Sequence, residues 1–279
     1  TINPGTGAIT VGNRAALNYE ATTTFTLTVR VSDGSLTDTA TVTINLNDIN
    51  DAPVVNAATF PLAENSPATT VVGTVTATDE DLPAQSLTWS ITGGNIGDAF
   101  AIDDSGQITV ANATPLDFET TPTFSLTVQA SDGSLTGSAT MTINLTGVNE
   151  APVVTGATFS LAENSVVNSL VGTPIAVTDP DDTSFTWTIP AGNDLGGFTI
   201  NSSGQVSVAD PAPLDYETHP SFNLTVRATD GDGLWDEAQV TINLTNVNEF
   251  PVVTPATFTL PENSLAATPV GTVTATDPE

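Results

Sequence analysis

The sequence of 279 residues contains no cysteine, and its Lys+Arg total of 3 consists of arginines alone. Without cysteine no disulfide can form, so a small domain that folds outside the cell needs another clamp, often a metal ion. Against these cations stand 32 Asp and Glu residues, which give a formal net charge of −29. A surface of this sign repels nucleic acids and anionic membranes, so we expect neither as a direct partner.

The chain also lacks a long apolar run, and no segment of ten residues has helical spacing. No stretch has the length of a membrane span or the pattern of a signal peptide. Charged residues make up only 13% of the chain while apolar residues make up 39%, which excludes an acidic disordered tail. The acidic residues are therefore carried at particular positions of a folded chain.

Proline-led junctions divide the sequence into repeats. Pro53, Pro152 and Pro251 are spaced 99 residues apart, and each follows an Asn next to a carboxylate. A period this long is that of a whole domain and not of a solenoid turn. The spacing predicts two complete domains between two partial ones, as in an excerpt from a longer array. These are residues 1–51 (the C-terminal half of a repeat), 52–150 and 151–249 (complete repeats) and 250–279 (the N-terminal third of a further repeat).

Within each full repeat, apolar residues alternate with Thr and Ser, as Phe124, Leu126, Val128 and Ala130 do. Residues 52–150 contain seven such runs, separated by turns rich in Gly, Asp, Asn and Pro. Seven short strands in about a hundred residues predict an all-β protein of tandem, seven-stranded Greek-key β-sandwiches of the immunoglobulin-like type.

The acidic residues recur at four places in each repeat. A Glu-Asn pair follows the first predicted strand, an Asp-x-Asp follows the second, an Asp-x-Glu precedes the sixth and an Asp-Gly follows the sixth. Alternate loops of an antiparallel sandwich lie at opposite ends, so stacked repeats should bring all four elements to one junction. Between the complete repeats this set is Glu64, Asp117, Glu119, Asn149, Glu150, Asp179, Asp181 and Asp230.

Seven carboxylates in one set need a neutralising partner, and the chain has no lysine to provide one. A single like-charge pair at close range costs about 4 kcal/mol at an effective dielectric constant of 20. A hard divalent cation with about six to eight oxygen ligands is the natural partner, which favours Ca²⁺ over Mg²⁺. The equivalent candidates are Glu20, Asn50, Asp51, Asp79, Asp81 and Asp132 at the first junction, and Glu163, Asp215, Glu217, Asn248, Glu249 and Asp277 at the third.

These elements, in this order, resemble cadherin repeats of the kind found in bacterial surface adhesins, over all 279 residues. The resemblance implies the seven-strand cadherin sandwich and about three Ca²⁺ ions at each junction. It assigns two groups of ligands at the middle junction, with Asp181 bridging. The ions nearer the earlier repeat would take Glu64, Asp117, Glu119 and Glu150, and the ion nearer the later repeat would take Asn149, Asp179, Asp181 and Asp230.

The sequence departs from this pattern in two ways. Its linker is one residue shorter than that usual in animal cadherins, and two of its three copies carry Glu in place of the central Asp. Asn18 stands where the later repeats have Asp117 and Asp215. We therefore expect the first junction to hold fewer ions.

The sequence thus predicts a non-enzymatic extender segment of a calcium-rigidified adhesin, extracellular or on a bacterial cell surface. Its expected partners are calcium ions and neighbouring repeats of the same chain. One alternative is a calcium-dependent carbohydrate-binding module for cell-surface polysaccharide, with Trp235 as its candidate aromatic platform. A second is a self-assembling filament in which copies of the chain contact one another.

Two simpler interpretations also stay open at the level of the sequence. The acids could be solvated side chains at turn positions, although their fixed register and the lack of lysine argue against this. Paired carboxylates could also be the acid and base of a glycosidase. They recur in every repeat without an insertion that would form a cleft, so we predict no enzyme.

Overall fold

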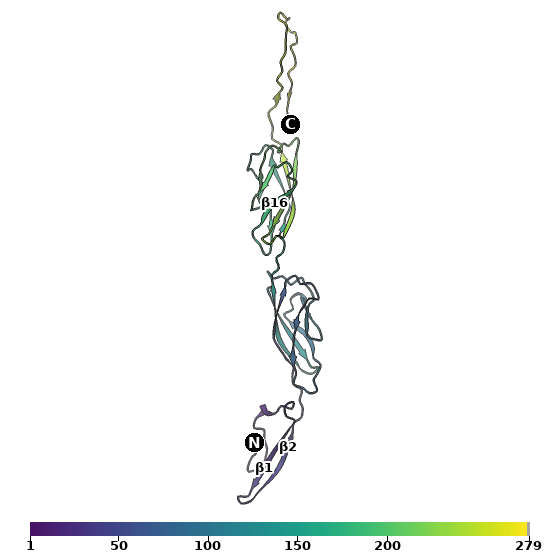
Figure 1. Ribbon diagram of the computed structural model, residues 1–279, viewed down its shortest axis with the longest axis vertical. Helices are drawn as coiled ribbons and strands as arrows, with labels where there is room; N and C mark the ends of the chain where they lie inside the picture. The colour runs from purple at the N-terminus through teal and green to yellow at the C-terminus, as the bar shows by residue number, and fades with distance from the viewer. Residues whose placement is uncertain (278–279) are drawn as a thin grey trace. The chain divides into compact units, whose positions relative to one another are not determined.

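A computed structural model describes residues 1–277, in two compact units, Thr1–Val148 and Asn149–Glu279 (Figure 1). The described residues are in strands and loops apart from two 3₁₀ helices, η1 (Arg14–Ala16) and η2 (Ile96–Asp98). The all-β class predicted from the sequence is therefore confirmed. Residues 1–277 contain no helix of the length and apolarity needed to cross a membrane.

The first unit contains one complete sandwich. Its larger sheet has the order β4-β11-β10-β7, and a three-stranded sheet β5-β9-β8 and a short pair β3-β6 form the rest. The bounds are β3 (Val54–Val55), β4 (Ala58–Ala63), β5 (Val71–Thr74), β6 (Ala77–Thr78), β7 (Thr88–Gly93), β8 (Phe100–Ile102), β9 (Gln107–Val110), β10 (Thr123–Ser131) and β11 (Thr136–Thr146).

The first long strand of this sandwich lies beside the last one. β4 pairs in parallel with β11, from Ala58 beside Met141 to Ala63 beside Thr146. β11 in turn forms an antiparallel hairpin with β10. Because β4 and β11 end side by side, the loop after β4 begins next to the linker that leaves the repeat. This register positions Glu64 for the site described below.

The core follows the alternation seen in the sequence. Along β10 the residues Phe124, Leu126, Val128 and Ala130 are buried, while the residues between them are exposed or half-buried. The rings of Phe124 and Phe100 meet edge to face, with centroids 5.1 Å apart, which joins the two sheets.

All seven predicted strands are present, with two differences. A short strand, β3, precedes them, and the run expected from Val71 to Ala77 is divided into β5 and β6. The pairing of β5 with β9 shifts register between Val71 and Gly73. The ring of Phe60 lies where a Cβ on Gly73 would be, so the glycine permits a close approach and the strand bends there.

The second unit repeats this plan, with the sheet orders β13-β20-β19-β16, β14-β18-β17 and β12-β15. Trp187 on β16 packs in its core and is 8% exposed, as expected. The bounds are β12 (Val153–Val154), β13 (Ala157–Ala162), β14 (Leu170–Val171), β15 (Val177–Thr178), β16 (Thr186–Ala191), β17 (Phe198–Ile200), β18 (Val206–Val208), β19 (Ser221–Thr229) and β20 (Trp235–Thr245).

The partial repeats keep the pairing of the complete ones. In the first unit, β1 (Thr24–Ser32) and β2 (Thr37–Asn45) form the purple hairpin of Figure 1, in which Thr24 lies opposite Asn45. This is the register of Thr123 opposite Asn144, 99 residues later. In the second unit, β21 (Val252–Val253) pairs with β22 (Ala275–Thr276), as β3 pairs with β6.

Candidate metal centres at the ends of the repeats

Each complete repeat has an outgoing end, which its own linker leaves, and an incoming end, which the preceding linker enters. At the outgoing end of residues 52–150, the carboxylate of Glu64 is buried, with 3% of the residue exposed. Its Oε1 accepts the N–H of Val148 at 2.6 Å, and its Oε2 accepts the N–H of Phe118 at 2.7 Å. One carboxylate therefore joins the end of β4, the loop before β10 and the linker.

Two further acids meet Glu64 at this end. One oxygen each from Glu64, Asp117 and Glu119 lie within 4.8 Å of one another. Asp117 accepts hydrogen bonds from the hydroxyl and the N–H of Thr120, and these hold the pKa of its carboxyl below the usual value. Asp117 thus stays ionised, and the mutual repulsion of the three carboxylates would be relieved by a bound cation.

The incoming end of the same repeat gathers a second group, Asp79, Asp81 and Asp132, again with oxygens within 4.8 Å of one another. The linker before it contributes two hydrogen bonds. Asn50 donates its Nδ2 to Asp132 Oδ2 at 2.9 Å, and the N–H of Asp51 donates to Asp81 Oδ1 at 3.0 Å. The loops and the preceding linker are therefore built into one oxygen-rich cluster, as the sequence predicted.

Hydrogen bonding keeps part of this cluster charged. The N–H of Leu135 lowers the pKa of Asp132 most, and the Asn50 amide and the N–H of Ser134 lower it further. Asp81 is 4% exposed and accepts N–H donors on both of its oxygens. Asp79 differs, because its Oδ2 is buried without a hydrogen-bond partner. A buried carboxylate oxygen in that condition suits a metal ion.

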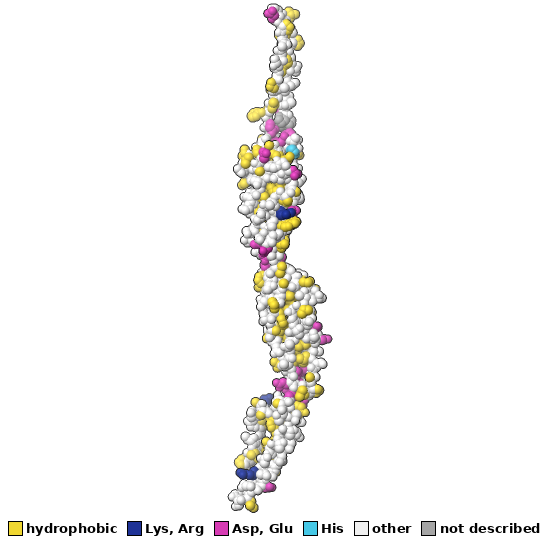
Figure 2. Space-filling model, in the orientation of Figure 1, with side chains coloured by type: hydrophobic (Ala, Val, Ile, Leu, Met, Phe, Trp, Pro, Cys, Tyr) yellow, Lys and Arg dark blue, Asp and Glu magenta, His cyan; other side chains and the backbone are white. Residues whose placement is uncertain are grey.

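Four acids extend this cluster towards the β1–β2 hairpin. Oxygens of Glu20, Asp48 and Asp81 form one close group, and those of Glu20, Asp51 and Glu80 form another. Glu20 Oε1 is also buried without a hydrogen-bond partner. Figure 2 shows the acidic side chains of this unit gathered mainly where the hairpin gives way to the complete sandwich.

Asp48 and Glu80 were not among the residues predicted from the sequence. Each stands in only one of the aligned repeats, since the other linkers have Gly147 or Asn246 in place of Asp48, and Pro180 follows Asp179 where Glu80 follows Asp79. A comparison of the linkers position by position could have found them. Asn18, the predicted weaker copy of an acid, donates its Nδ2 to Glu80 Oε2 at 3.0 Å.

In the second unit, the incoming end has the same hydrogen bonds between the linker and the loops. Asn149 donates its Nδ2 to Asp230 Oδ2 at 2.9 Å, and the N–H of Glu150 donates to Asp181 Oδ2 at 2.9 Å. The Asn149 amide lowers the pKa of Asp230 most, followed by N–H groups of the turn after it. Asp179 Oδ2 is buried without a hydrogen-bond partner, as is its equivalent in Asp79.

The outgoing end of residues 151–249 copies the Glu64 arrangement. Glu163 is 2% exposed, and its two oxygens accept the N–H groups of Val247 at 2.6 Å and Tyr216 at 2.7 Å. The pKa of Glu217 is raised, first by burial and then by repulsion from Glu163, Glu249 and Asp215. The remaining predicted ligands lie around these residues: Asn248 bonds to the Glu249 carbonyl, and Asn164 donates to Glu249 Oε1 at 2.6 Å.

The last predicted ligand, Asp277, directly follows β22 and is exposed. Glu279, which would correspond to Asp181, lies outside the described residues.

The donor atoms decide which metal these ends suit. The clusters consist of carboxylate and amide oxygens, with no His or Cys among the residues named above. Oxygen-only sets are typical of hard cations, and a large number of flexible carboxylates suits Ca²⁺ better than Mg²⁺. The buried, unpartnered oxygens of Glu20, Asp79 and Asp179 fit the same ion.

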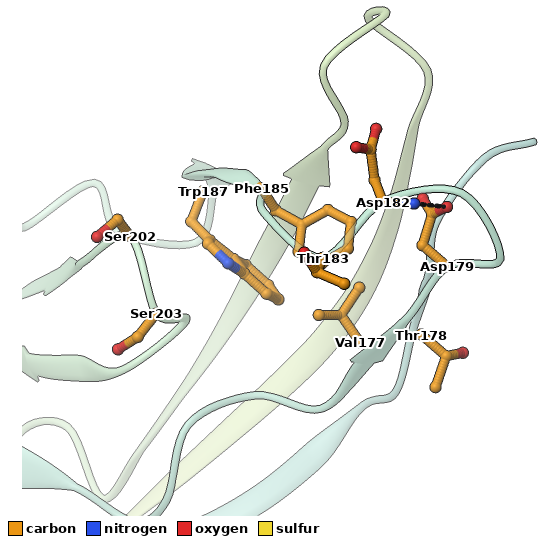
Figure 3. Close-up of a pocket in the computed structure, with 9 residues that line it drawn as sticks. All are labelled: Val177, Thr178, Asp179, Asp182, Thr183, Phe185, Trp187, Ser202 and Ser203. Atoms are coloured by element: carbon orange, nitrogen blue, oxygen red, sulfur yellow. Dashed lines mark hydrogen bonds between the residues drawn. The ribbon is translucent and has the colours of Figure 1, made fainter. Parts of the chain in front are cut away.

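A pocket of about 420 Å³ flanks the incoming end of residues 151–249 (Figure 3). The indole of Trp187 and the ring of Phe185 form its apolar side, and Ser202 and Ser203 lie opposite Asp179 and Asp182. The N–H of Asp182 donates to Asp179 Oδ1 at 3.0 Å, which fixes the loop beside the candidate ligands.

Trp235, the candidate sugar platform, is 50% exposed at the start of β20. The guanidinium of Arg227 lies 4.0 Å from the centre of its ring and forms a salt bridge of 2.7 Å with Glu237. One face of the indole is therefore already covered by a cation.

Comparisons with known proteins agree with this architecture. The family model described as Cadherin domain matches residues 58–146 and 157–245. The whole chain is 33% identical to the Protocadherin-like wing polarity protein stan of Drosophila melanogaster, of which it covers 8%. Over 82% of its length it is 34% identical to human Protocadherin Fat 1, of which it covers 5%. The chain thus spans a small fraction of these curated relatives.

Solved structures share the fold. The protocadherin GammaB4 extracellular domain matches 94% of the chain with a TM-score of 0.63 and 26% identity, and 44% of that structure is covered. The EC22-24 fragment of mouse Cadherin-23 matches 83% of the chain with a TM-score of 0.60 and 27% identity, and 77% of it is covered.

Proposed function

The chain belongs to the cadherin family, and from that premise we propose that it is an extender segment of a calcium-rigidified, extracellular adhesin. Cadherin domains are domains of cell-adhesion proteins, and the comparisons match this chain to adhesion proteins. The proposed domains are 52–150 and 151–249 as complete repeats, with parts of repeats at 1–51 and 250–279. The family matches at 58–146 and 157–245 fall inside the two complete repeats.

One observation carries the proposal. In the first unit, a single oxygen-rich cluster combines loop residues of a repeat, Asp79, Asp81 and Asp132, with Asn50 and Asp51 of the linker before it. A Ca²⁺ ion held by both would fix the linker to the repeat. It would supply positive charge for carboxylates that otherwise repel one another.

The residues proposed to hold ions are those predicted from the sequence, together with Asp48 and Glu80. Together they present carboxylate and amide oxygens in fixed places. Asn50 and Asn149 orient Asp132 and Asp230, while Glu64 and Glu163 hold the outgoing linkers in position. With an ion bound, the linker loses freedom to bend, and the stiffness of the segment follows the external calcium concentration.

The proposed location follows from a matched structure, and the proposed source follows from the composition of the chain. The matched protocadherin GammaB4 structure is an extracellular domain, and we propose the same location for this chain. We propose a bacterial source because the chain lacks lysine and is rich in Thr, Asn and Asp. The relatives named above are animal proteins, so this part rests on composition alone.

Two other partners remain candidates. Further copies of the chain could contact it laterally, and a cell-surface polysaccharide could bind at Trp235. The polysaccharide has less in its favour, because Arg227 covers one face of that indole. Calcium binding at the repeat ends therefore ranks first.

Small-angle scattering and thermal melting of the full chain test the proposal, in Ca²⁺ and then in excess chelator. A ligand at 100 times its Kd stabilises the folded state by about 2.7 kcal/mol per site. We expect Ca²⁺ to raise the melting temperature and narrow the distribution of shapes. Mg²⁺ at equal ionic strength is the control. Identical curves in Ca²⁺, Mg²⁺ and chelator would mean that the acids are solvated loop residues.

A further inference from the structure

Aspartate precedes glycine at Asp33, Asp132, Asp230 and Asp232. In such a pair the glycine nitrogen can attack the aspartyl Cγ, because glycine has no side chain to hinder the approach. The first three pairs directly follow β1, β10 and β19, in equivalent turns. The pair at Asp232 has no counterpart, because the turn after β19 is one residue longer than the other two. The chain therefore allows a comparison of one unusual pair with three similar ones.

In the three equivalent turns, N–H groups of the turn hold the carboxylate. Asp33 Oδ1 accepts the N–H groups two and three residues after it, both at 2.8 Å. Asp132 Oδ1 accepts the same two, at 2.6 Å and 2.7 Å. Asp230 Oδ1 accepts the N–H groups two, three and four residues after it, at 3.0 Å, 2.6 Å and 2.8 Å. Rotation of any of these carboxyl groups towards the next glycine therefore breaks at least two hydrogen bonds.

The carboxylate of Asp232 is held by no such bonds. The N–H of Asp232 donates to Asp230 Oδ1 at 3.0 Å, but within residues 1–277 no hydrogen-bond donor reaches its side chain. Asp232 is exposed, as are the glycines on either side of it. Gly233 has a φ of +96°, and nothing lies within 4 Å of where its Cβ would be. The carboxyl group can therefore turn towards the Gly233 nitrogen without the loss of a hydrogen bond.

Neither exposure nor the glycine nitrogen distinguishes Asp232 from all the other pairs. Asp33 is exposed as well. Every glycine N–H of the four pairs has an acceptor: Ser32 Oγ for Gly34 at 3.2 Å, Ser131 Oγ for Gly133 at 3.1 Å, Asp182 Oδ2 for Gly231 at 3.2 Å and Asp230 Oδ1 for Gly233 at 2.6 Å. The difference lies in the hydrogen bonds of the aspartate side chain.

We propose that Asp232 is a site of spontaneous modification in the folded protein, at which aspartate is converted to isoaspartate through a succinimide. The Gly233 nitrogen attacks Cγ of the carboxyl group and forms the N–Cγ bond. The Cγ–O bond breaks, and the amide proton and the carboxyl hydroxyl leave as water. Solvent water then adds to the main-chain carbonyl carbon of Asp232 and breaks its bond to the Gly233 nitrogen. The chain is left linked through Cγ, with one more methylene in its backbone and an unchanged composition.

The modification changes the turn that holds Asp230. Asp230 Oδ1 accepts the N–H of Gly233 at 2.6 Å, while its Oδ2 accepts the amide of Asn149 in the linker. A succinimide nitrogen carries no hydrogen, so the bond from Gly233 is lost when the ring forms. The extra methylene of isoaspartate then displaces the N–H groups that follow. The change therefore loosens the turn that the linker contacts, and it does so whether or not an ion binds there.

Peptide mapping by mass spectrometry, after incubation of the folded full chain at neutral pH, tests the proposal. Fragment ions distinguish isoaspartate from aspartate at each pair. Isoaspartate should form at Asp232 about tenfold faster, or more, than at Asp33, Asp132 and Asp230, because those carboxyl groups must first break two or more hydrogen bonds. Asp33 is the closest comparison, because it is exposed too. Equal rates at Asp33 and Asp232 would overturn the inference.

Two controls separate the effect of the fold from the chemistry of the pair. The hydrogen bonds of the turns are absent in concentrated urea, so the four pairs should react there at similar rates. Asp232→Glu keeps the charge, but its longer side chain would have to close a larger ring, so no isomer should form at this position. Circular dichroism verifies that this variant is folded. Isoaspartate at Asp232 in urea but not in the folded chain would also overturn the inference, because the fold would then protect this pair.

Discussion

Glu64 Oε1 accepts the backbone N–H of Val148 at 2.6 Å, across 84 residues of sequence. Glu163 and Val247 repeat this bond at 2.6 Å, also across 84 residues. In each case the other oxygen of the carboxylate accepts an N–H from the loop before the sixth predicted strand. Each glutamate thus holds the linker against the loop through two hydrogen bonds, and it is also a candidate metal ligand. The two roles can be separated by experiment.

Replacement of Glu64 by Ala should destabilise the first unit even in chelator. The substitution removes the acceptor of the N–H groups of Val148 and Phe118. Glu64 is only 3% exposed, so water does not readily replace its carboxylate. Two such losses cost about 2–6 kcal/mol. Urea unfolding of the full chain in chelator measures the change, with the exposed Asp104→Ala as the near-neutral control. Equal stability of the two variants would show that the two hydrogen bonds of Glu64 contribute nothing to the stability of the unit.

Gly192 is predicted to be intolerant of any side chain. Its φ is +79°, and a Cβ there would overlap the carbonyl of Asn223 on the neighbouring strand. We expect Gly192→Ala to cost about 3 kcal/mol or more. Gly196 has a φ of +68° with open space around it, so Gly196→Ala should cost only about 1 kcal/mol. Similar melting temperatures for both variants would contradict the packing at Gly192.

The fold was largely predictable from the sequence because apolar and polar residues alternate along each strand and the same pattern recurs in each repeat. Burial alternates strictly along β10, so Phe124, Leu126 and Val128 identify the core without knowledge of the partner strands. The meeting of Glu64 with Asp117 was predictable too, since loops at the same end of a sandwich converge. The register shift within β5 was not, because it lies where the Phe60 ring packs on Gly73.

The missed residues of the candidate site have a common feature. Asp48, Glu80 and Gln85 each occur in a single repeat, so a search for recurring elements passes over them. Gln85 stands in a loop whose length does not repeat, and its Nε2 donates to Asp81 Oδ2 and to Asn50 Oδ1. Ion binding by the twenty predicted residues stays a prediction, as do the domain boundaries.

The β8–β9 turns of the two repeats should differ in their response to acid. Asp103 Oδ1 accepts the Ser105 hydroxyl, the N–H of Gln107 and the N–H of Ser105, which lower the pKa of its carboxyl. Asn201 makes the equivalent bonds to Ser203 and Gln205 without a titrating group. The turn at Asp103 is thus the one that carries a pH-dependent contribution.

Because the pKa of Asp103 is lower in the folded state, its contribution is complete above the unfolded pKa of about 3.9 and is lost as pH falls through the folded value. Asp103→Asn should therefore flatten the fall of melting temperature below about pH 4, with little change at pH 7. Asn201→Asp should steepen it. Parallel curves of melting temperature against pH for all three proteins would refute this assignment.

Equilibrium dialysis of the full chain against radioactive Ca²⁺ tests the central claim most directly, because it counts bound ions. We predict several ions per chain with Kd values of about 10⁻⁴–10⁻³ M. Asp81→Asn, at an oxygen cluster of the first unit, should lower the count, while the exposed Asp104→Asn should not. Less than one ion per chain at about 10 mM Ca²⁺, ten times the weakest expected Kd, would contradict calcium binding at the repeat ends.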